Sequence, residues 1–219
     1  MNDVLSVGVH RLWKRYFIEK LDPYPGTKLL DVAGGTGDIA FEFLRYVTEK
    51  GDSTSSVVVC DINENMMKVG QQRAAKQKMD PNRLDWVHGD GLNLPFEENT
   101  FDAYSVVFGI RNMVNLPKAI DEAYRVLKPG GIFMCMEFSQ VNNVFLKSFY
   151  DWYSYQMIPV IGEVVSNDFK SYQYLVESIR KFPDQETFKA MIEESGFKLV
   201  DYDNLSCGIA AIHSGYKPL

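Results

Sequence analysis

The chain has 219 residues, 46% of them hydrophobic, and a formal net charge of −6. This length suits one α/β domain over residues 1–219, and the acidic balance argues against a nucleic-acid partner, which needs a basic stripe. No apolar run approaches the roughly 20 residues that span a bilayer, and no signal peptide is visible. The cysteines are isolated and no histidine lies at metal-ligand spacing, so we expect no metal site.

Strand and helix patterns alternate from residue 28 to about 139, as in a doubly wound parallel sheet. Apolar, β-rich runs predict strands at 28–33, 57–62, 84–88, 101–108 and 131–138. A 3.6-residue periodicity predicts helices between them at 37–49, 64–79 and 116–127. We expect Lys128-Pro129-Gly130-Gly131 to end the last of these helices, because Pro and Gly are the usual terminators.

The remaining chain predicts an insertion, a helix and a hairpin. Residues 142–182 are rich in aromatic side chains and indicate a helical insertion. Asp184 can N-cap the helix that follows, which Gly196 ends. Two final strand-like runs, 197–205 and 208–216, can pair as an antiparallel hairpin. The predicted fold class is therefore α/β, a Rossmann-like seven-stranded sheet that is mostly parallel, with an antiparallel C-terminal hairpin and a small helical insertion.

The most informative motif is Asp31-Val32-Ala33-Gly34-Gly35-Thr36-Gly37, between the first strand and the first of these helices. Glycines at such a turn let the backbone approach a ligand, and free amides point outward. Asp61 ends the next strand, which completes the layout of a nucleoside-binding domain. The segment Gly35-x-Gly37-x-x-Ala40 satisfies the dinucleotide fingerprint, with Asp61 placed on a ribose. The Asp31 carboxylate instead favours a cationic ligand, such as the methionine end of S-adenosylmethionine (SAM), because it would repel the negative charge of a pyrophosphate.

The same motif resembles motif I of class I SAM-dependent methyltransferases, whose layout also ends in a helix and an antiparallel hairpin. A nicotinamide dehydrogenase would normally need more chain for its substrate half. The resemblance implies that SAM is the cofactor and that Asp61 holds its ribose. It also implies that Asp90 accepts a bond from the adenine amino group and that the Gly91 amide reaches a ring nitrogen. The expected cofactor-binding residues are Asp31, Gly35, Thr36, Gly37, Asp61, Asp90 and Gly91.

More specific segments resemble the UbiE-type quinone C-methyltransferase family along essentially the whole chain. They are Phe108-Gly109-Ile110-Arg111-Asn112, Glu137-Phe138-Ser139, residues 171–179 and Phe182-Pro183-Asp184-Gln185. The segments 140–143 and 161–164 resemble the eukaryotic branch of that family. The resemblance implies ring methylation of 2-methoxy-6-polyprenyl-1,4-benzoquinol in ubiquinone biosynthesis. It also implies a homodimer, peripheral on the matrix side of the mitochondrial inner membrane, in a complex with other ubiquinone-biosynthesis enzymes.

The chemistry of such a reaction indicates where a catalytic group is needed. A quinol ring carbon is a poor nucleophile until its hydroxyl loses a proton, so the protein must favour the phenolate. Arg111 follows the fourth strand, at the edge where substrate meets SAM in this fold. Its guanidinium stays protonated, so we expect it to stabilise the phenolate while a water acts as base. We expect Asn112 to orient the ring oxygens. The competing interpretation is that Arg111 only pairs with a nearby acid.

The sequence also leaves open the role of the insertion and the reaction itself. The insertion at 142–182 suits a lid over a lipid-tailed substrate, although its apolar side chains equally suit core packing or a dimer contact. Three alternative functions stay open. The chain is a methyltransferase of demethylmenaquinol, an NAD-binding oxidoreductase, or a non-catalytic SAM-binding scaffold of a quinone-biosynthesis complex. If Arg111 is not the activating group, His213 and Tyr153 are the next candidates.

Overall fold

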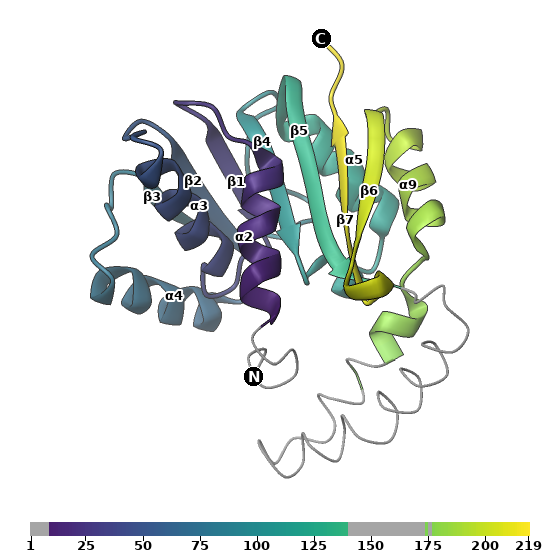
Figure 1. The fold of residues 1–219 in the computed structure, drawn as a ribbon, viewed down its shortest axis with the longest axis horizontal. Helices are drawn as coiled ribbons and strands as arrows, with labels where there is room; N and C mark the ends of the chain where they lie inside the picture. Colours follow the sequence, from purple (N-terminus) through teal and green to yellow (C-terminus); the bar gives the residue numbers. More distant parts are fainter. Residues whose placement is uncertain (1–8, 140–173, 175–176) are drawn as a thin grey trace.

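The computed structural model describes residues 9–139, 174 and 177–219. Seven strands form one sheet in the order β3-β2-β1-β4-β5-β7-β6, with helices on both faces (Figure 1). The strands are β1 (Lys28–Val32), β2 (Ser56–Asp61), β3 (Leu84–His88), β4 (Phe101–Val107), β5 (Leu127–Phe138), β6 (Lys198–Leu205) and β7 (Ala210–Tyr216). Strands β1 to β5 pair in parallel, and β7 is antiparallel to both β5 and β6. The predicted fold class is therefore confirmed.

Helices cover the two faces of the sheet because alternate strand residues point to opposite sides. Leu29 packs in the core under α2 and α3, whereas Leu30 packs in the core under α5 and α9. The described helices are α2 (Val9–Leu21), α3 (Asp38–Glu49), α4 (Glu64–Lys76), α5 (Leu116–Val126) and α9 (Gln185–Glu194), with 3₁₀ turns η1 (Ile110–Asn112) and η3 (Ser206–Gly208). The predicted cap of α9 is confirmed, since the Asp184 carboxylate accepts the Thr187 amide at 2.8 Å.

Two predicted boundaries are wrong by more than two residues, and the others differ by two residues or fewer. Strand β5 begins at Leu127 rather than at 131, because Leu127 already pairs with Phe101 of β4. Pairing with β4 resumes at Ile132, after an irregularity that contains the Pro-Gly-Gly segment. Gly130, with a φ of +77°, donates to the Lys217 carbonyl, and the Lys217 amide donates to Gly131. Helix α4 ends at Lys76 rather than at 79, because Lys78 adopts a left-handed φ of 55° and the chain turns back there.

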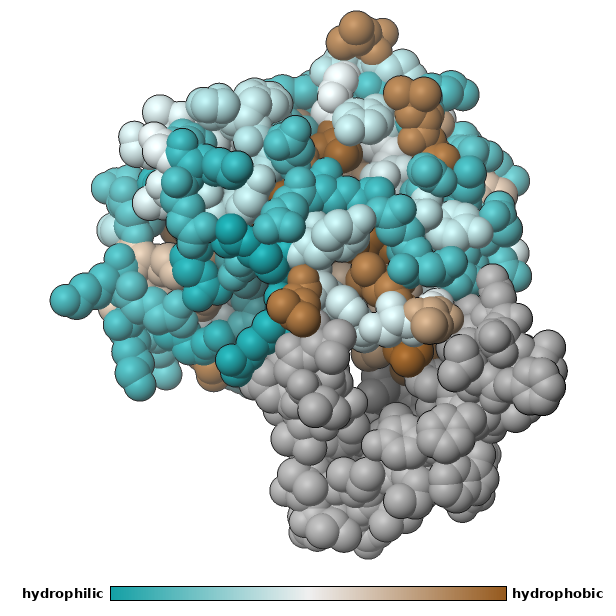
Figure 2. All heavy atoms as spheres, in the orientation of Figure 1, coloured by the Kyte–Doolittle hydropathy of each residue, from teal (hydrophilic) through white to brown (hydrophobic). Residues whose placement is uncertain are grey.

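The described surface is mainly polar on the face that Figure 2 shows, with apolar residues in small patches. Within 9–139 and 177–219, no helix is long and apolar enough to cross a membrane, and no group of three or more potential metal ligands occurs among the same residues. Most of the predicted insertion at 142–182 lies outside the described residues, so its predicted role as a lid stays a prediction.

Candidate active site

The glycine-rich turn joins β1 to α3 at the carboxyl edge of the parallel strands. Ala33, Gly35 and Gly37 have φ values of 53°, 55° and 80°, in the left-handed region that favours glycine. A Cβ at Gly37 would lie 2.8 Å from the Trp86 ring, so a larger residue does not fit there. The predicted glycine turn is thus present, and both its backbone conformation and its packing require glycine.

Asp31 lies in β1 directly before this turn and is 1% exposed. Its Oδ1 accepts a 2.8 Å hydrogen bond from the Ser105 hydroxyl of β4. Its Oδ2 is buried and has no hydrogen-bond partner among the described residues. Burial, together with the nearby Asp61 and Asp38, raises the pKa of Asp31 to about 7. A buried carboxylate oxygen without a donor is costly, and a cationic ligand group would supply the missing partner.

Asp61, at the end of β2, is also buried, but both its oxygens accept backbone amides. Oδ2 accepts the Gly35 amide at 2.8 Å, and Oδ1 accepts the Asn63 amide at 2.7 Å. Asp61 therefore holds the glycine-rich turn directly. Because each carboxylate oxygen can accept more than one bond, the predicted contact with ribose hydroxyls remains compatible with this geometry.

The loop after β3 carries the two residues predicted at the adenine. Asp90 is exposed, and its Oδ1 accepts the Leu92 amide at 2.9 Å. Gly91 is buried, and a Cβ there would lie 2.7 Å from the Met113 methyl and 3.3 Å from Val32. The end of β1 and the loops after β3 and β4 therefore meet at Gly91, as the prediction of one shared site requires.

Arg111 lies in η1, directly after β4, and forms an ion pair with Glu137 of β5. The Arg111 side chain is 11% exposed and that of Glu137 is 2% exposed. Nη1 of Arg111 donates to Glu137 at 2.9 Å and to the Phe108 carbonyl at 2.7 Å, while Nε donates to the Ser178 hydroxyl at 3.3 Å. The acid pairing that the sequence left open is therefore present.

This ion pair still leaves part of the guanidinium available. Burial raises the pKa of Glu137, although Arg111 and two backbone amides lower it. Nη2 of Arg111 forms no hydrogen bond to any residue of the described chain. A side chain fixed through Nη1 and Nε with Nη2 unbonded is pre-oriented for an anion. The predicted catalytic role of Arg111 stays a prediction.

The other predicted catalytic candidates differ in position. Asn112 is exposed beside Arg111, and its Oδ1 accepts the Tyr174 hydroxyl at 3.2 Å. His213 is buried in the middle of β7, where its Nε2 is 3.0 Å from the Gln185 carbonyl. Burial lowers the pKa of His213 to about 4. It packs on Phe188 of α9 rather than at the edge that holds the other candidates. Tyr153 lies outside the described residues.

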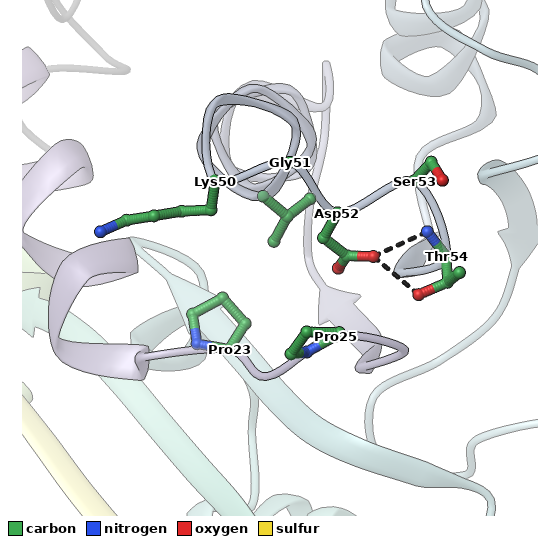
Figure 3. Close-up of a pocket in the computed structure, with 8 residues that line it drawn as sticks. Pro23, Pro25, Lys50, Gly51, Asp52, Ser53 and Thr54 are labelled. Carbon is green, nitrogen blue, oxygen red and sulfur yellow. Dashed lines mark hydrogen bonds between the residues drawn. The ribbon is translucent and has the colours of Figure 1, made fainter.

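Sequence reasoning missed the partners of the predicted residues. Ser105 donates to Asp31, and Glu137 pairs with Arg111. Each is a polar residue within or at the end of a run of apolar strand residues, and that signal could have identified both. A pocket of about 250 Å³ (Figure 3) lies elsewhere, among residues that precede β1 and β2 at the opposite edge of the sheet.

Comparisons with known proteins identify the family of the chain. The chain matches the ubiE/COQ5 methyltransferase family over residues 1–217. It is 52% identical to the mitochondrial 2-methoxy-6-polyprenyl-1,4-benzoquinol methylase of Bos taurus, over 99% of this chain and 74% of that protein. It is 58% identical to the ubiquinone/menaquinone biosynthesis C-methyltransferase UbiE of Cereibacter sphaeroides, over 99% of this chain and 84% of that protein.

A solved structure supports the fold. Phosphoethanolamine N-methyltransferase 2 of Haemonchus contortus, in complex with SAM, superposes with a TM-score of 0.69 at 16% identity. The match covers 94% of this chain and 52% of that one. At this identity the likeness concerns the fold alone.

Proposed function

The chain belongs to the ubiE/COQ5 methyltransferase family, and from this premise we propose that it methylates a ring carbon of 2-methoxy-6-polyprenyl-1,4-benzoquinol in ubiquinone biosynthesis. It is a SAM-dependent C-methyltransferase of the class I fold. The observation that carries the proposed substrate is the 52% identity, over almost the whole chain, to a methylase named for it.

The residues of the site fit SAM. The unpartnered Oδ2 of Asp31 offers a buried negative atom to the cationic methionine end. Asp61 would hold the ribose from the end of β2, and Asp90 with Gly91 would hold the adenine. When bound, SAM supplies a methyl group on a sulfonium sulfur, which is already activated for transfer. The protein therefore needs to bind, orient and deprotonate the quinol rather than activate the methyl donor.

Arg111 is the residue that we assign to the quinol. Its contacts with Glu137 and the Phe108 carbonyl fix the guanidinium plane, and Nη2 remains to stabilise negative charge on a ring oxygen. Because the guanidinium does not give up its proton, another group must take the quinol proton, and we assign this role to a water. Asn112 would orient a ring oxygen from the neighbouring position.

A second substrate class has its own support. The bacterial relative is named for both ubiquinone and menaquinone biosynthesis, and it aligns over 217 residues. The bovine relative aligns over 246 positions, more than the 219 residues of this chain, so it contains residues that this chain lacks. On this basis we keep demethylmenaquinol as the second candidate substrate.

The proposal extends to location and assembly. The bovine relative is named as mitochondrial, and we place this protein on the matrix side of the inner membrane, peripherally bound, as a homodimer among other ubiquinone-biosynthesis enzymes. We also propose that residues 142–182 form the lid over the polyprenyl tail, within the single domain of residues 1–219. Light scattering of the purified protein tests the dimer, and deletion of the insertion tests the lid by its effect on KM for long-tailed substrate.

One experiment separates the proposed functions. Labelled SAM is supplied together with a demethylated benzoquinol or a demethylated naphthoquinol, and ring methylation is measured for each. Preferred turnover of the benzoquinol supports the proposal, and preferred turnover of the naphthoquinol supports the second candidate. Tight binding of S-adenosylhomocysteine without turnover of either would indicate a scaffold. Calorimetry in which NAD bound more tightly than S-adenosylhomocysteine would contradict both methyltransferase functions.

A further inference from the structure

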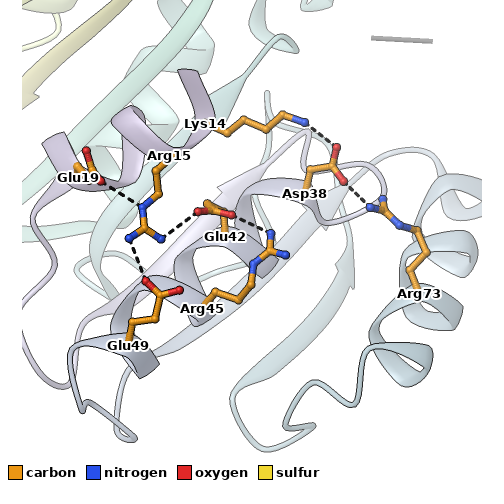
Figure 4. Close-up of polar contacts among 8 residues, drawn as sticks. All are labelled: Lys14, Arg15, Glu19, Asp38, Glu42, Arg45, Glu49 and Arg73. Atoms are coloured by element: carbon orange, nitrogen blue, oxygen red, sulfur yellow. Dashed lines mark hydrogen bonds and ion pairs between the residues drawn. The ribbon is translucent and has the colours of Figure 1, made fainter. Parts of the chain in front are cut away.

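Asp38, the first residue of α3, joins three helices at the N-terminus of that helix. Its Oδ2 accepts Nζ of Lys14 from α2 at 2.7 Å, and its Oδ1 accepts Nη2 of Arg73 from α4 at 2.7 Å (Figure 4). Burial raises the pKa of Asp38, but the bonds and charges of Lys14 and Arg73 outweigh it and lower the pKa overall. Asp38 is therefore charged and held from both sides.

Arg73 also binds the glycine-rich turn itself. Its Nη1 donates to the Thr36 hydroxyl at 2.6 Å and to the Thr36 carbonyl at 3.2 Å. Helix α4 packs closely on the same turn, because a Cβ at Gly70 would lie 3.1 Å from the Thr36 carbonyl carbon. One guanidinium thus fixes both the residue between the two left-handed glycines and the first residue of the helix that follows.

A second ionic network joins α2 to α3 further along both helices and provides an internal comparison. Arg15 contacts Glu19, Glu42 and Glu49, and Arg45 contacts Glu42 (Figure 4). Within the described chain, none of the hydrogen bonds of this network reaches residues 31–37. Exposed pairs of this kind contribute little to stability. The two networks therefore differ mainly in whether they contact the glycine-rich turn.

We propose that Arg73 and Lys14 are positioning residues for the cofactor turn: acting through Thr36 and Asp38, they hold the turn in its binding conformation and couple the docking of α2 to cofactor affinity. This inference rests on the proposed binding of SAM at the turn. Linkage is reciprocal, so a bound cofactor must in turn stabilise the docked position of α2.

The test measures the Kd of S-adenosylhomocysteine by calorimetry, with no substrate present. Arg73→Gln should raise the Kd about tenfold, because it removes charge-assisted bonds to the turn. Arg73→Lys should fall between Arg73→Gln and wild type, because it keeps the charge but not the planar fork. The matched control is Arg45→Gln, which also removes a helix-surface ion pair with one carboxylate. We expect this control to bind like wild type.

A second matched pair tests the contribution of α2. Lys14→Met removes the bond to Asp38, whereas Lys20→Met removes a bond from the same helix to Asp203 of β6. Only Lys14→Met should raise the Kd. Hydrogen exchange supplies a readout besides affinity: S-adenosylhomocysteine should slow exchange of the α2 amides in wild type and Lys20→Met, and slow it less in Lys14→Met.

Three outcomes are decisive. If folded Arg73→Gln and Lys14→Met bind S-adenosylhomocysteine as tightly as their controls, the inference is wrong and the network is only structural. If Arg73→Gln does not fold, the same comparison is made with Arg73→Lys, and wild-type affinity there overturns the inference. Failure of wild type to bind S-adenosylhomocysteine would instead contradict the proposed function, and it would contradict this inference as well.

Discussion

Two buried aspartates at opposite edges of the sheet show how the molecule separates structure from function. Asp52, before β2, accepts bonds from the amides and hydroxyls of both Thr54 and Ser55. Burial raises its pKa, but these donors outweigh burial and lower the pKa well below its ordinary value. Asp31, at the other edge, keeps one oxygen without a partner among the described residues, and its pKa rises to about 7.

The contrast shows that burial alone does not identify a functional acid. A buried carboxylate with a full set of donors stabilises its loop, whereas one with a missing donor carries a cost that a ligand can offset. The carboxyl edge of the strands also holds the Arg111–Glu137 pair and the left-handed glycine turn. Substitutions at this edge should therefore change binding and turnover, and substitutions at the opposite edge should change stability alone, with effects that decrease from Arg111 to Asp52.

The largest effect is expected from Arg111→Lys. We predict that quinol methylation falls by roughly a hundredfold or more, because a point charge keeps the pair with Glu137 but does not present a second donor to the phenolate. Affinity for S-adenosylhomocysteine should stay within a few-fold, so the loss should appear in kcat. Arg111→Lys is preferable to Arg111→Ala as a test. The alanine variant would leave the buried Glu137 without a charged partner, which would lower the free energy of unfolding by about 3–5 kcal/mol.

The control for this variant is an ion pair between β4 and β5 at the other edge of the sheet. Lys128 of β5 pairs with Asp102 of β4 at 2.7 Å, and Lys128→Met should keep wild-type turnover. A folded Arg111→Lys enzyme that methylates at a near-normal rate would show that Arg111 is only a structural partner. The search for the activating group would then move to residues outside the described chain, such as Tyr153, since His213 packs against α9.

Asp61→Ala is expected to have the next largest effect. We predict that SAM affinity falls about ten- to a hundredfold, because charge-assisted bonds are worth roughly 1.5–3 kcal/mol. The structure adds a second cause, since the Gly35 amide also loses its acceptor. Calorimetry measures the affinity, and circular dichroism confirms folding. Unchanged SAM binding by the folded variant would place the ribose contact elsewhere.

The raised pKa of Asp31 predicts a pH dependence of about tenfold in cofactor affinity between pH 6 and 8. A cationic ligand group binds the ionised carboxylate, so affinity should rise with pH through about 7. The effect on stability has the opposite sign: the folded state holds a proton that the unfolded state releases near pH 4, so stability falls as pH rises from about 4 to 7.

Asp31→Asn provides the control, because it cannot titrate. Calorimetry of S-adenosylhomocysteine at several pH values should give a weaker affinity and a flatter profile in this variant. A wild-type affinity that is flat across this range would show that Asp31 does not face the cationic end of the ligand.

Much of this site follows from the sequence, because local rules fix it. Gly35 and Gly37 have positive φ values that glycine tolerates best, and the alternation of strands and helices predicts the sheet. What sequence reasoning missed depends on register between distant strands. Ser105 reaches Asp31 because β1 and β4 pair those two residues directly. Glu137 reaches Arg111 across 26 residues of chain.

The missed start of β5 has the same cause. A Pro-Gly-Gly segment predicts an open turn from local preferences alone. Here Lys217 near the C-terminus forms hydrogen bonds with Gly130 and Gly131, and β5 runs from Leu127 through this irregular segment. Tertiary pairing overrides turn propensity at this position, and only the folded chain reveals it.

The smallest effect is expected at Asp52, at the edge of the sheet opposite the candidate active site. Asp52→Ala should lower the free energy of unfolding by about 1–3 kcal/mol, because the Ser55 and Thr54 amides lose their acceptor. Cofactor affinity and turnover should not change, since this loop precedes β2 at the far edge.

The lowered pKa of Asp52 also predicts a pH dependence of stability. The stabilisation is present above pH 4 and is lost as the carboxylate protonates at lower pH. Urea unfolding of wild type and variant at pH 7 and pH 3 should therefore show a smaller difference at pH 3. A variant of normal stability with weakened cofactor binding would reverse the assignment and place function at this edge.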